Sequence, residues 1–329
     1  MRRLLIRTLA TLLLAAAVLT GVVLRQYDYD LREERVTVPH AGGRLSGVLA
    51  LPPSGPGPFG LVVLVHGDGP VDATHEGFYR PLWESFARAG YASLSLSKPG
   101  VGGSEGDWLS QSMDDRADET LAAVAWARTR PGIDPHRIGL WGASQAGWVL
   151  PKAAARDRSL RFVIAVSPAV DWQQQGRYNL LAELAAEGAD ETAVRTALER
   201  REDTLRRLRE GAPDAPGITP ERWRFITRNH RSNATDDLRA AAGTPTLLIL
   251  AGHDRNVDTA DTETTYRRLL PPDTLTVRHY PDAAHSLVTD TIESSPVRLT
   301  LTAVLAPRRL FAPGFLTDQQ HFLEHLPPD

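Results

Sequence analysis

Apolar residues recur along the chain in short runs, and segments with helical spacing lie between them. The runs at 61–66, 162–167 and 246–251 are continuous, which is typical of strands buried on both faces of a parallel sheet. Further strands are predicted at 35–39, 45–51, 91–97, 137–141 and 275–280, and helices at 78–89, 113–128, up to 155 after the run at 137–141, and 260–270. This alternation predicts an α/β fold, a mostly parallel sheet with helices on both faces.

The alternation stops between residues 172 and 242. This segment is charged and favours helices, above all at 191–210, and its alternating charges suit i,i+4 pairs on a solvated surface. It also suits a lid over an active site, and the two interpretations are compatible. A substrate would then enter beneath the insertion, where Trp172 and Trp223 would line a pocket or, as we favour, form the core of the lid.

The first residues have the pattern of a membrane segment. Arg2, Arg3 and Arg7 precede an uncharged, mostly apolar run at 8–24, which predicts an N-terminal membrane anchor or signal segment over 1–26 and a location outside the cytoplasm. We favour an uncleaved anchor over a signal that is removed to give a secreted protein, because the run is long for a signal-peptide core. A linker at 27–34 then leads to a domain at 35–329.

Composition removes several classes of function. The 329 residues carry a formal net charge of −3, which gives no reason to expect a nucleic-acid partner. The chain has no cysteine, so disulfides, thiolate metal sites and a cysteine nucleophile are excluded. Since no group of His, Asp and Glu has metal-ligand spacing, we expect no metal. The sequence predicts no oligomeric state.

The strand predicted at 137–141 leads into Gly142-Ala143-Ser144-Gln145-Ala146-Gly147. A serine between small residues at a strand-to-helix turn is the pattern of a nucleophile elbow, which exposes the hydroxyl beside the start of a helix. The backbone N–H of Gln145 would then face an oxyanion. The fifth position of the pattern is Ala146 rather than glycine, which suits a requirement for smallness.

A serine nucleophile needs a base and an acid, and elbow enzymes present them in the order serine, acid, histidine. Asp254 follows the strand predicted at 246–251, and His285 follows the strand predicted at 275–280. Asp258 is the rival acid, but Asp254 lies closer to its strand end. His253 is expected to point away. The three candidates Ser144, Asp254 and His285 thus stand in the required order.

The run at 61–65 ends in His66-Gly67-Asp68-Gly69-Pro70. This loop is placed to supply a second oxyanion donor through the backbone N–H of Asp68 or Gly69. We expect His66 to brace the loop rather than to act in catalysis, and the Asp68 carboxylate to lie near the pocket.

In this order and spacing, the segments 66–70, 142–147, 252–257 and 284–286 resemble the α/β-hydrolase superfamily, and 98–104 is similar to its glycine turn. The likeness is to bacterial serine esterases and related peptidases with a helical insertion before the penultimate strand. It implies an eight-stranded sheet, a Ser-His-Asp triad and an acyl-enzyme mechanism without a cofactor. Ala146 and Ser97, the latter in place of a common aspartate, depart from the family pattern.

We therefore expect a serine hydrolase that cleaves carboxylic esters through an acyl-enzyme intermediate, with a small ester or peptide-like substrate. Three alternatives stay open. The first is an aminopeptidase or acyl-peptide hydrolase with the same triad, which would need an anionic anchor for a free amino terminus. The others are a thioesterase or acyltransferase, and a catalytically inactive binding module at the membrane.

Overall fold

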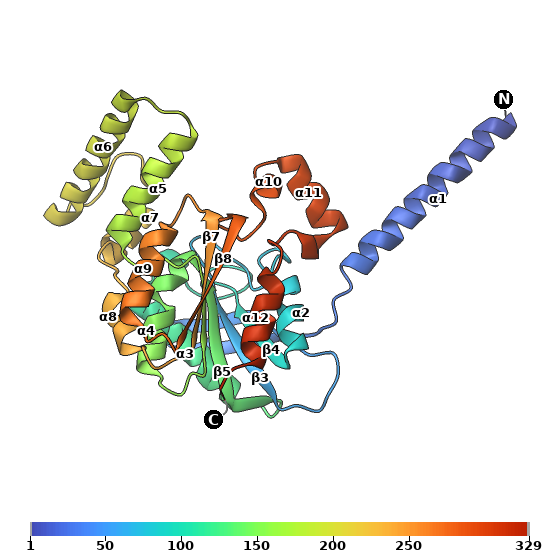
Figure 1. Ribbon diagram of the computed structural model, residues 1–329, viewed down its shortest axis with the longest axis horizontal. Helices are drawn as coiled ribbons and strands as arrows, with labels where there is room; N and C mark the ends of the chain where they lie inside the picture. Colours follow the sequence, from blue (N-terminus) through green and yellow to red (C-terminus); the bar gives the residue numbers. More distant parts are fainter. Residues whose placement is uncertain (1, 328–329) are drawn as a thin grey trace.

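The computed structural model describes residues 2–327, with only the backbone described at 2–7, 9, 10, 12, 15 and 16. Eight strands form one sheet in the order β1-β2-β4-β3-β5-β6-β7-β8 (Figure 1). They are β1 (Arg32–His40), β2 (Gly43–Leu51), β3 (Phe59–Val65), β4 (Tyr91–Leu96), β5 (Ile133–Ala143), β6 (Val163–Val166), β7 (Thr246–His253) and β8 (Leu275–Ala284). β1, β2 and β4 pair antiparallel and the other neighbours pair parallel, so the predicted mostly parallel sheet is confirmed.

The central strands are apolar at every position because helices cover both faces of the sheet. Along β3, Leu61, Val63 and Val65 pack into one hydrophobic core, and Val62 and Leu64 pack into the other. Helices α3 (Met113–Arg128), α4 (Leu150–Arg156), α8 (Thr235–Ala240) and α9 (Thr259–Leu269) cover the first face; α2 (Arg80–Arg88) and α12 (Phe315–Glu324) cover the second (Figure 1). Alternate side chains therefore enter opposite cores, and neither face can be polar.

Several strands are longer than the apolar runs that predicted them. β1 begins at Arg32 rather than at residue 35, because its antiparallel pairing with β2 continues until Arg32 meets Leu51. The end of the expected linker is therefore part of the sheet. β7 and β8 continue to His253 and Ala284, which pair with each other beyond the end of the apolar run. Hydrogen bonding, not hydropathy, sets these ends.

The insertion between β6 and β7 contains α5 (Trp172–Ala186), α6 (Glu191–Glu210), α7 (Pro220–Asn229) and α8. Asp190 caps the start of α6, and Gly211 ends it in the left-handed region with φ 70°. Trp223 is 1% exposed and packs with Leu205 and Leu208 in a small core of the insertion, as expected. α5 and α6 lie together at one side of the molecule in Figure 1, whereas α7 packs on the short 3-10 helix η1 (Trp108–Ser110) and α8 packs on α4 and α9.

The chain after His285 forms helices that the sequence analysis did not assign. α10 (Asp290–Glu293) and α11 (Pro296–Leu305) lie beyond the carboxyl end of β8, and a short 3-10 helix, η3 (Pro307–Arg309), leads on towards α12 (Figure 1). α12 then returns to pack on α2. The polypeptide thus crosses the carboxyl edge of the sheet before it covers the second face.

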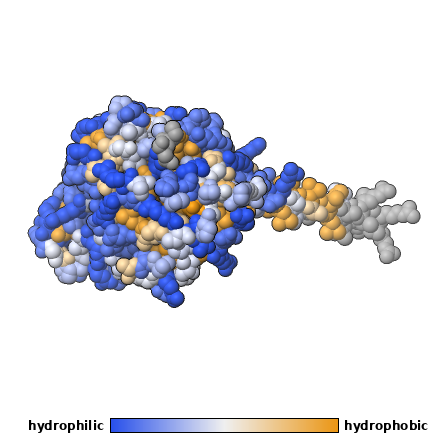
Figure 2. Space-filling view, turned by 90° about the horizontal axis from the view of Figure 1, so that it is seen from below, coloured by the Kyte–Doolittle hydropathy of each residue, from blue (hydrophilic) through white to orange (hydrophobic). Residues whose placement is uncertain are grey.

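The N-terminal helix α1 (Arg2–Gln26) extends away from the body, with apolar residues along its exposed surface (Figures 1 and 2). In residues 2–327, no helix combines the length and the hydropathy that crossing a bilayer requires. This finding does not support the predicted membrane anchor. The location outside the cytoplasm stays a prediction from the sequence.

Arg308 joins the two ends of the chain to the body. Its guanidinium donates to the buried carboxylate of Glu84 at 2.7 and 2.8 Å, and to the carbonyl oxygens of Gln26 and Asp28 at 2.7 and 3.0 Å. It also lies 4.4 Å from the centre of the Tyr29 ring. Burial alone would raise the pKa of Glu84, but hydrogen bonding to Arg308 keeps it below its usual value.

Replacement of Arg308 should therefore destabilise the fold. Arg308→Ala leaves the Glu84 carboxylate buried with only the more exposed Arg88 as a cationic partner, so we expect a loss of about 2–3 kcal/mol in the free energy of unfolding. Arg309→Ala, at the exposed neighbouring residue, is the control and should change it by less than about 0.5 kcal/mol. Urea denaturation measures both variants, and equal effects would contradict the role of Arg308.

Candidate active site

Ser144 lies at the end of β5, where the strand turns into the short helix η2 (Ser144–Trp148). Its φ is 57°, a conformation that is strained for a residue with a side chain and is expected of a nucleophile elbow. Gly147 explains the displaced glycine of the pattern, because a Cβ at this position would overlap the backbone of Ala169. Ala146 is fully buried, and a Cβ at Gly142 would lie only 2.7 Å from its own Cβ, so the two small residues pack closely. The predicted elbow is therefore present in the backbone.

The register of β7 and β8 brings Asp254 and His285 together. His253 pairs with Ala284, so the next residues of the two parallel strands are Asp254 and His285. The pairing of β7 with β8 shifts between Ala251 and His253, and this shift brings Asp254 opposite His285. Gly252 permits the shift, because a Cβ there would overlap the carbonyl of Pro281. The Nδ1–H of His285 donates to the two carboxylate oxygens of Asp254 at 2.9 and 2.8 Å.

Asp254 is held in place on every side. Its side chain is 1% exposed, and Oδ1 also accepts the backbone N–H groups of Asn256 at 2.9 Å and Val257 at 2.8 Å. A carboxylate at Nδ1 places the proton of the neutral imidazole on that nitrogen, so Nε2 carries the free lone pair. The pair is thus arranged to present a base on the side of the ring away from Asp254.

The register of β3 and β5 brings the loop after β3 beside the elbow. Val65 pairs with Gly142, and two residues further on a Cβ at Gly67 would lie 3.4 Å from the Cβ of Ser144. One residue further again, the Gln145 amide donates to Asp68 Oδ1 at 3.0 Å. Gly67, which the sequence analysis gave no role, therefore lies against the serine. Asp68 and Gly69 follow it along the same loop.

His66 braces this loop, as expected. Its Nε2–H donates to the carbonyl oxygen of Leu96 at 2.7 Å, and Nδ1 accepts the hydroxyl of Tyr79 at 3.2 Å. Burial, together with the nearby Lys98, lowers the pKa of His66 to about 3, so the ring stays neutral. Both ring nitrogens are occupied by these bonds. The side chain is therefore structural.

Ser97 departs from the family pattern but still supplies an acceptor. Its Oγ accepts the backbone N–H of Ala73 at 2.9 Å, which ties the loop after β4 to the loop after β3. The hydroxyl of Ser104 closes the same turn by donating to the carbonyl oxygen of Ser97 at 2.8 Å.

Two buried basic side chains hold the loops around Ser144, and neither role was predicted from the sequence. Arg116, on α3, donates to the Gln145 amide oxygen at 2.7 Å and to the carbonyl oxygen of His66 at 2.5 Å. Lys98 donates to the carbonyl oxygen of Gly67 at 2.6 Å. Burial, and then the charge of Arg116, lowers the pKa of Lys98 to about 6, so the amine is largely neutral at pH 7.

The insertion contacts two loops at the carboxyl edge of the sheet, the loop after β3 and the loop after β7. Arg222, from α7, forms a two-bond ion pair with the Asp68 carboxylate at 3.0 and 2.6 Å. On the other side, the hydroxyl of Tyr178 donates to the carbonyl oxygen of Asp254 at 2.8 Å, and Gln175 donates to that of Asn256 at 2.8 Å. Burial would raise the pKa of Asp68, but Arg222 keeps it below its usual value, so this carboxylate near the pocket is ionised and paired.

Neither alternative residue takes the place of Asp254 or His285. Asp258 caps the start of α9 by accepting the backbone N–H of Asp261 at 3.1 Å, and its other oxygen meets the Gln174 amide at 3.4 Å. His253 is exposed at the end of β7, where it lines the same small cavity as His285. The structure thus places Asp254, and not Asp258, at His285.

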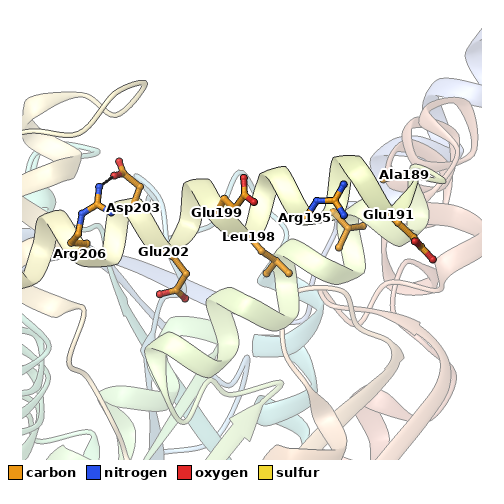
Figure 3. A pocket seen from close by; sticks show the side chains of 9 residues that line it. Ala189, Glu191, Arg195, Leu198, Glu199, Glu202, Asp203 and Arg206 are labelled. Atoms are coloured by element: carbon orange, nitrogen blue, oxygen red, sulfur yellow. Dashed lines mark hydrogen bonds and ion pairs between the residues drawn. The ribbon is translucent and has the colours of Figure 1, made fainter.

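Two cavities border these residues. One, of about 240 Å³, contains His285 in its wall and is lined by polar groups that follow β7 and β8. The other, of about 710 Å³, is bounded by Asp68, Gly69 and Ser286 and is mostly apolar. A third hollow of about 690 Å³ lies along α6 and is unrelated to the site, because Ala189 and residues of α6 alone form its wall (Figure 3). Within the described residues, no group of three or more His, Asp or Glu could hold a metal ion.

Comparison with known proteins identifies the family of the chain. The family described as Serine aminopeptidase, S33, matches residues 56–292, which cover most of the chain and contain Ser144, Asp254 and His285. The chain belongs to this family. It is an α/β hydrolase, and its relatives include esterases and peptidases.

Similarity to individual proteins is more limited. The chain is 32% identical over 118 residues to a thiohydrolase, aneE, of Aspergillus aculeatus (35% of this chain, 37% of the relative), and 34% identical over 113 residues to the quorum-quenching protein AidA of Acinetobacter baumannii (34% and 36%). The matches thus span little more than a third of these relatives. Esterase Pf2001 of Pyrococcus furiosus superposes with a TM-score of 0.57 at 16% identity, over 90% of this chain and 92% of the esterase. DcsB superposes with 0.59 at 14%, over 90% and 99%. These structures show the fold alone.

Lys98 gives the stability a specific pH dependence. Between about pH 6 and pH 10 the unfolded chain binds one more proton at this lysine than the folded chain does, so its contribution to the free energy of unfolding rises with pH. In Lys98→Met this contribution is absent. The difference in unfolding free energy, wild type minus variant, should rise by about 2 kcal/mol from pH 7 to pH 9.

Urea denaturation at the two pH values measures this difference. Lys152→Met, at the other lysine, which pairs with Asp237 at 3.0 Å near the surface, is the matched control and should keep the wild-type pH slope. A difference for Lys98→Met that is constant between pH 7 and pH 9 would contradict the burial of a neutral amine.

Proposed function

We propose that the protein is a serine hydrolase that cleaves carboxylic esters through an acyl-enzyme intermediate, with Ser144 as nucleophile, His285 as general base and acid, and Asp254 as the residue that orients it. The observation that carries the proposal is the hydrogen bond from His285 Nδ1 to Asp254 at 2.8 Å, at the same edge of the sheet as a serine with φ 57°. Strain at Ser144 suits a hydroxyl that must stand clear of its strand.

In this mechanism His285 Nε2 takes the hydroxyl proton as Ser144 Oγ attacks the ester carbonyl. The backbone N–H of Gln145 and that of Asp68 or Gly69 stabilise the oxyanion. The imidazolium then protonates the leaving alcohol. Water repeats the sequence on the acyl-enzyme and releases the acid. Asp254 stays ionised throughout, and its two backbone donors support that state.

The loop contacts support the assignment of the oxyanion donors. Arg116 holds the side chain of Gln145 and the carbonyl of His66, so both loops that carry the proposed oxyanion donors are held in place before substrate binds. Donors fixed in advance need no reorganisation when charge develops. We also propose that residues 172–242 act as a lid over the active site of the domain at 35–329. Arg222 connects the insertion to the loop of Asp68, and Tyr178 connects it to the loop of Asp254.

An aminopeptidase is the second candidate, and the family match favours it. Fungal relatives include a probable dipeptidyl-aminopeptidase B of Sordaria macrospora, 28% identical over 149 residues. The same triad would serve both reactions. The two candidates differ in the acyl group, because an aminopeptidase requires a free amine beside the scissile bond.

Substitutions at the triad should separate a catalytic serine from a structural one. With p-nitrophenyl butyrate as substrate, we expect Ser144→Ala to lower kcat/KM by at least about 10⁴-fold and Asp254→Asn by about 10⁴-fold. Asp258→Asn is the matched control, because asparagine caps a helix as well as aspartate does, and should keep kcat/KM within about threefold. Wild-type activity in Ser144→Ala would exclude the proposed nucleophile.

The same enzyme preparation, assayed on aminoacyl p-nitroanilides, distinguishes the two candidates. Turnover of p-nitrophenyl esters without turnover of the anilides supports the esterase. A higher kcat/KM on the anilides would replace it with the aminopeptidase.

A further inference from the structure

The cavity of about 710 Å³ is built where three distant parts of the chain meet. Its wall contains the loop after β3 from Asp68 to Pro81, Tyr27 and Tyr29 of the N-terminal segment, and residues of the chain from Ser286 to Leu310. The Tyr27 hydroxyl donates to the carbonyl oxygen of Ala303 on α11 at 2.8 Å, so two of these parts are bonded together. The cavity therefore exists only because both ends of the chain return to the carboxyl edge of the sheet.

The position of this cavity relates it to the proposed chemistry. Asp68 and Gly69, which carry the proposed oxyanion donor, form one side, and Ser286, the residue after His285, forms another. The insertion contributes no residue to the wall. The cavity thus lies beside the loop of the proposed oxyanion donor. The sequence pattern instead predicts a substrate beneath the insertion.

The wall is mostly apolar, and its volume lies within the range of small-molecule sites, about 300–1,000 Å³. The apolar side chains are Pro70, Val71, Phe78, Pro81, Val288, Leu299, Ala303, Pro307 and Leu310. Phe78 packs on Phe311 with the ring centres 4.7 Å apart, which fixes that side of the cavity. An apolar group of a ligand would gain free energy by leaving water for this space.

The charged side chains of the wall are all acidic. They are Asp68, Asp72, Glu76 and Glu293, and the wall contains neither Lys nor Arg. Asp72 is fixed by the N–H and hydroxyl of Thr74 at 2.7 and 2.8 Å. Burial lowers the pKa of His75, which also lines the wall. An anionic ligand would therefore find like charges and no cation in the wall, so an anionic occupant is disfavoured.

We assign the alcohol part of the ester to the smaller cavity, of about 240 Å³. His285 itself lines it, together with Arg255, Asn256 and Ser294. Since His285 is the group that protonates the leaving alcohol, the alcohol belongs on this polar side. The acyl group then lies on the side of the oxyanion loop, where the large apolar cavity is.

We propose that the 710 Å³ cavity between the loop after β3, the N-terminal segment and α11 is the acyl pocket, and that it selects esters with a medium-length acyl chain that carries no negative charge. This proposal rests on the proposed function and names its substrate class. It gives the N-terminal segment and α11 a direct part in specificity.

A bulky residue in the wall should shorten the accepted chain. Ala303 faces the cavity, whereas Val304, its neighbour on α11, is 40% exposed and does not line it. We expect the wild type to prefer p-nitrophenyl octanoate to the acetate by at least tenfold in kcat/KM, since each buried methylene contributes roughly fourfold. Ala303→Trp should abolish that preference, while Val304→Trp should behave as the wild type.

Charge is tested with the mono-p-nitrophenyl ester of adipic acid, which carries a carboxylate at the end of its acyl chain. We expect its kcat/KM to be at least tenfold below that of p-nitrophenyl hexanoate. Equal rates, an octanoate preference that survives in Ala303→Trp, or one that is lost equally in Val304→Trp would overturn the acyl pocket.

Binding without turnover separates this proposal from the proposed function. In the Ser144→Ala background, titration calorimetry with methyl octanoate should give a Kd at least tenfold weaker when Ala303→Trp is added, and unchanged when Val304→Trp is added. Loss of binding with Ala303→Trp supports the pocket whether or not the enzyme hydrolyses esters. Unchanged binding overturns the pocket even if Ser144 is the nucleophile.

Discussion

The candidate site depends on the register of parallel strands at the carboxyl edge of the sheet. Val65 pairs with Gly142, and the same offset, continued past the strand ends, sets Gly67 against Ser144 and Asp68 against Gln145. His253 pairs with Ala284, and the same offset sets Asp254 against His285. A shift of one residue in either pair would turn these side chains to the other face. The helices support the strands that carry these residues, and the insertion contacts the loops. Buried Arg116 and Lys98 hold the loops around Ser144 in place.

Residues whose chemistry is local to a strand end could be predicted from the sequence. Apolar runs located β3, β5, β7 and β8, and small or titratable residues directly after them identified Ser144, Asp254, His285 and the loop at Asp68. Arg116 could not be found in this way, because an arginine in a charged helix has the pattern of a solvated face and only tertiary packing buries it. Arg222 likewise reads as one of many arginines in the insertion, and its partner Asp68 lies far away in sequence. The proposed acyl pocket could not be predicted from the sequence either, because segments near both ends of the chain form its wall.

The edge of the sheet is thus enclosed from two sides by different parts of the chain. The insertion contacts the loops of Asp68 and Asp254 through polar bonds on the surface, where such pairs contribute little stability but set geometry. On the other side Arg308 and Tyr27 bind the N-terminal segment to the helices after His285, and the apolar cavity lies between them. A polar cover on one side and an apolar pocket on the other divide the proposed roles of closing the site and choosing the acyl group.

The central claim is that Ser144 is an activated nucleophile, and a fluorophosphonate probe tests it most directly, because it reacts with serines that a neighbouring base activates. Intact-mass analysis and peptide mapping of the native protein after treatment should show one adduct, on the peptide that contains Ser144, and Ser144→Ala should carry none. A wild-type protein without an adduct, or an adduct that persists in Ser144→Ala, would contradict the account.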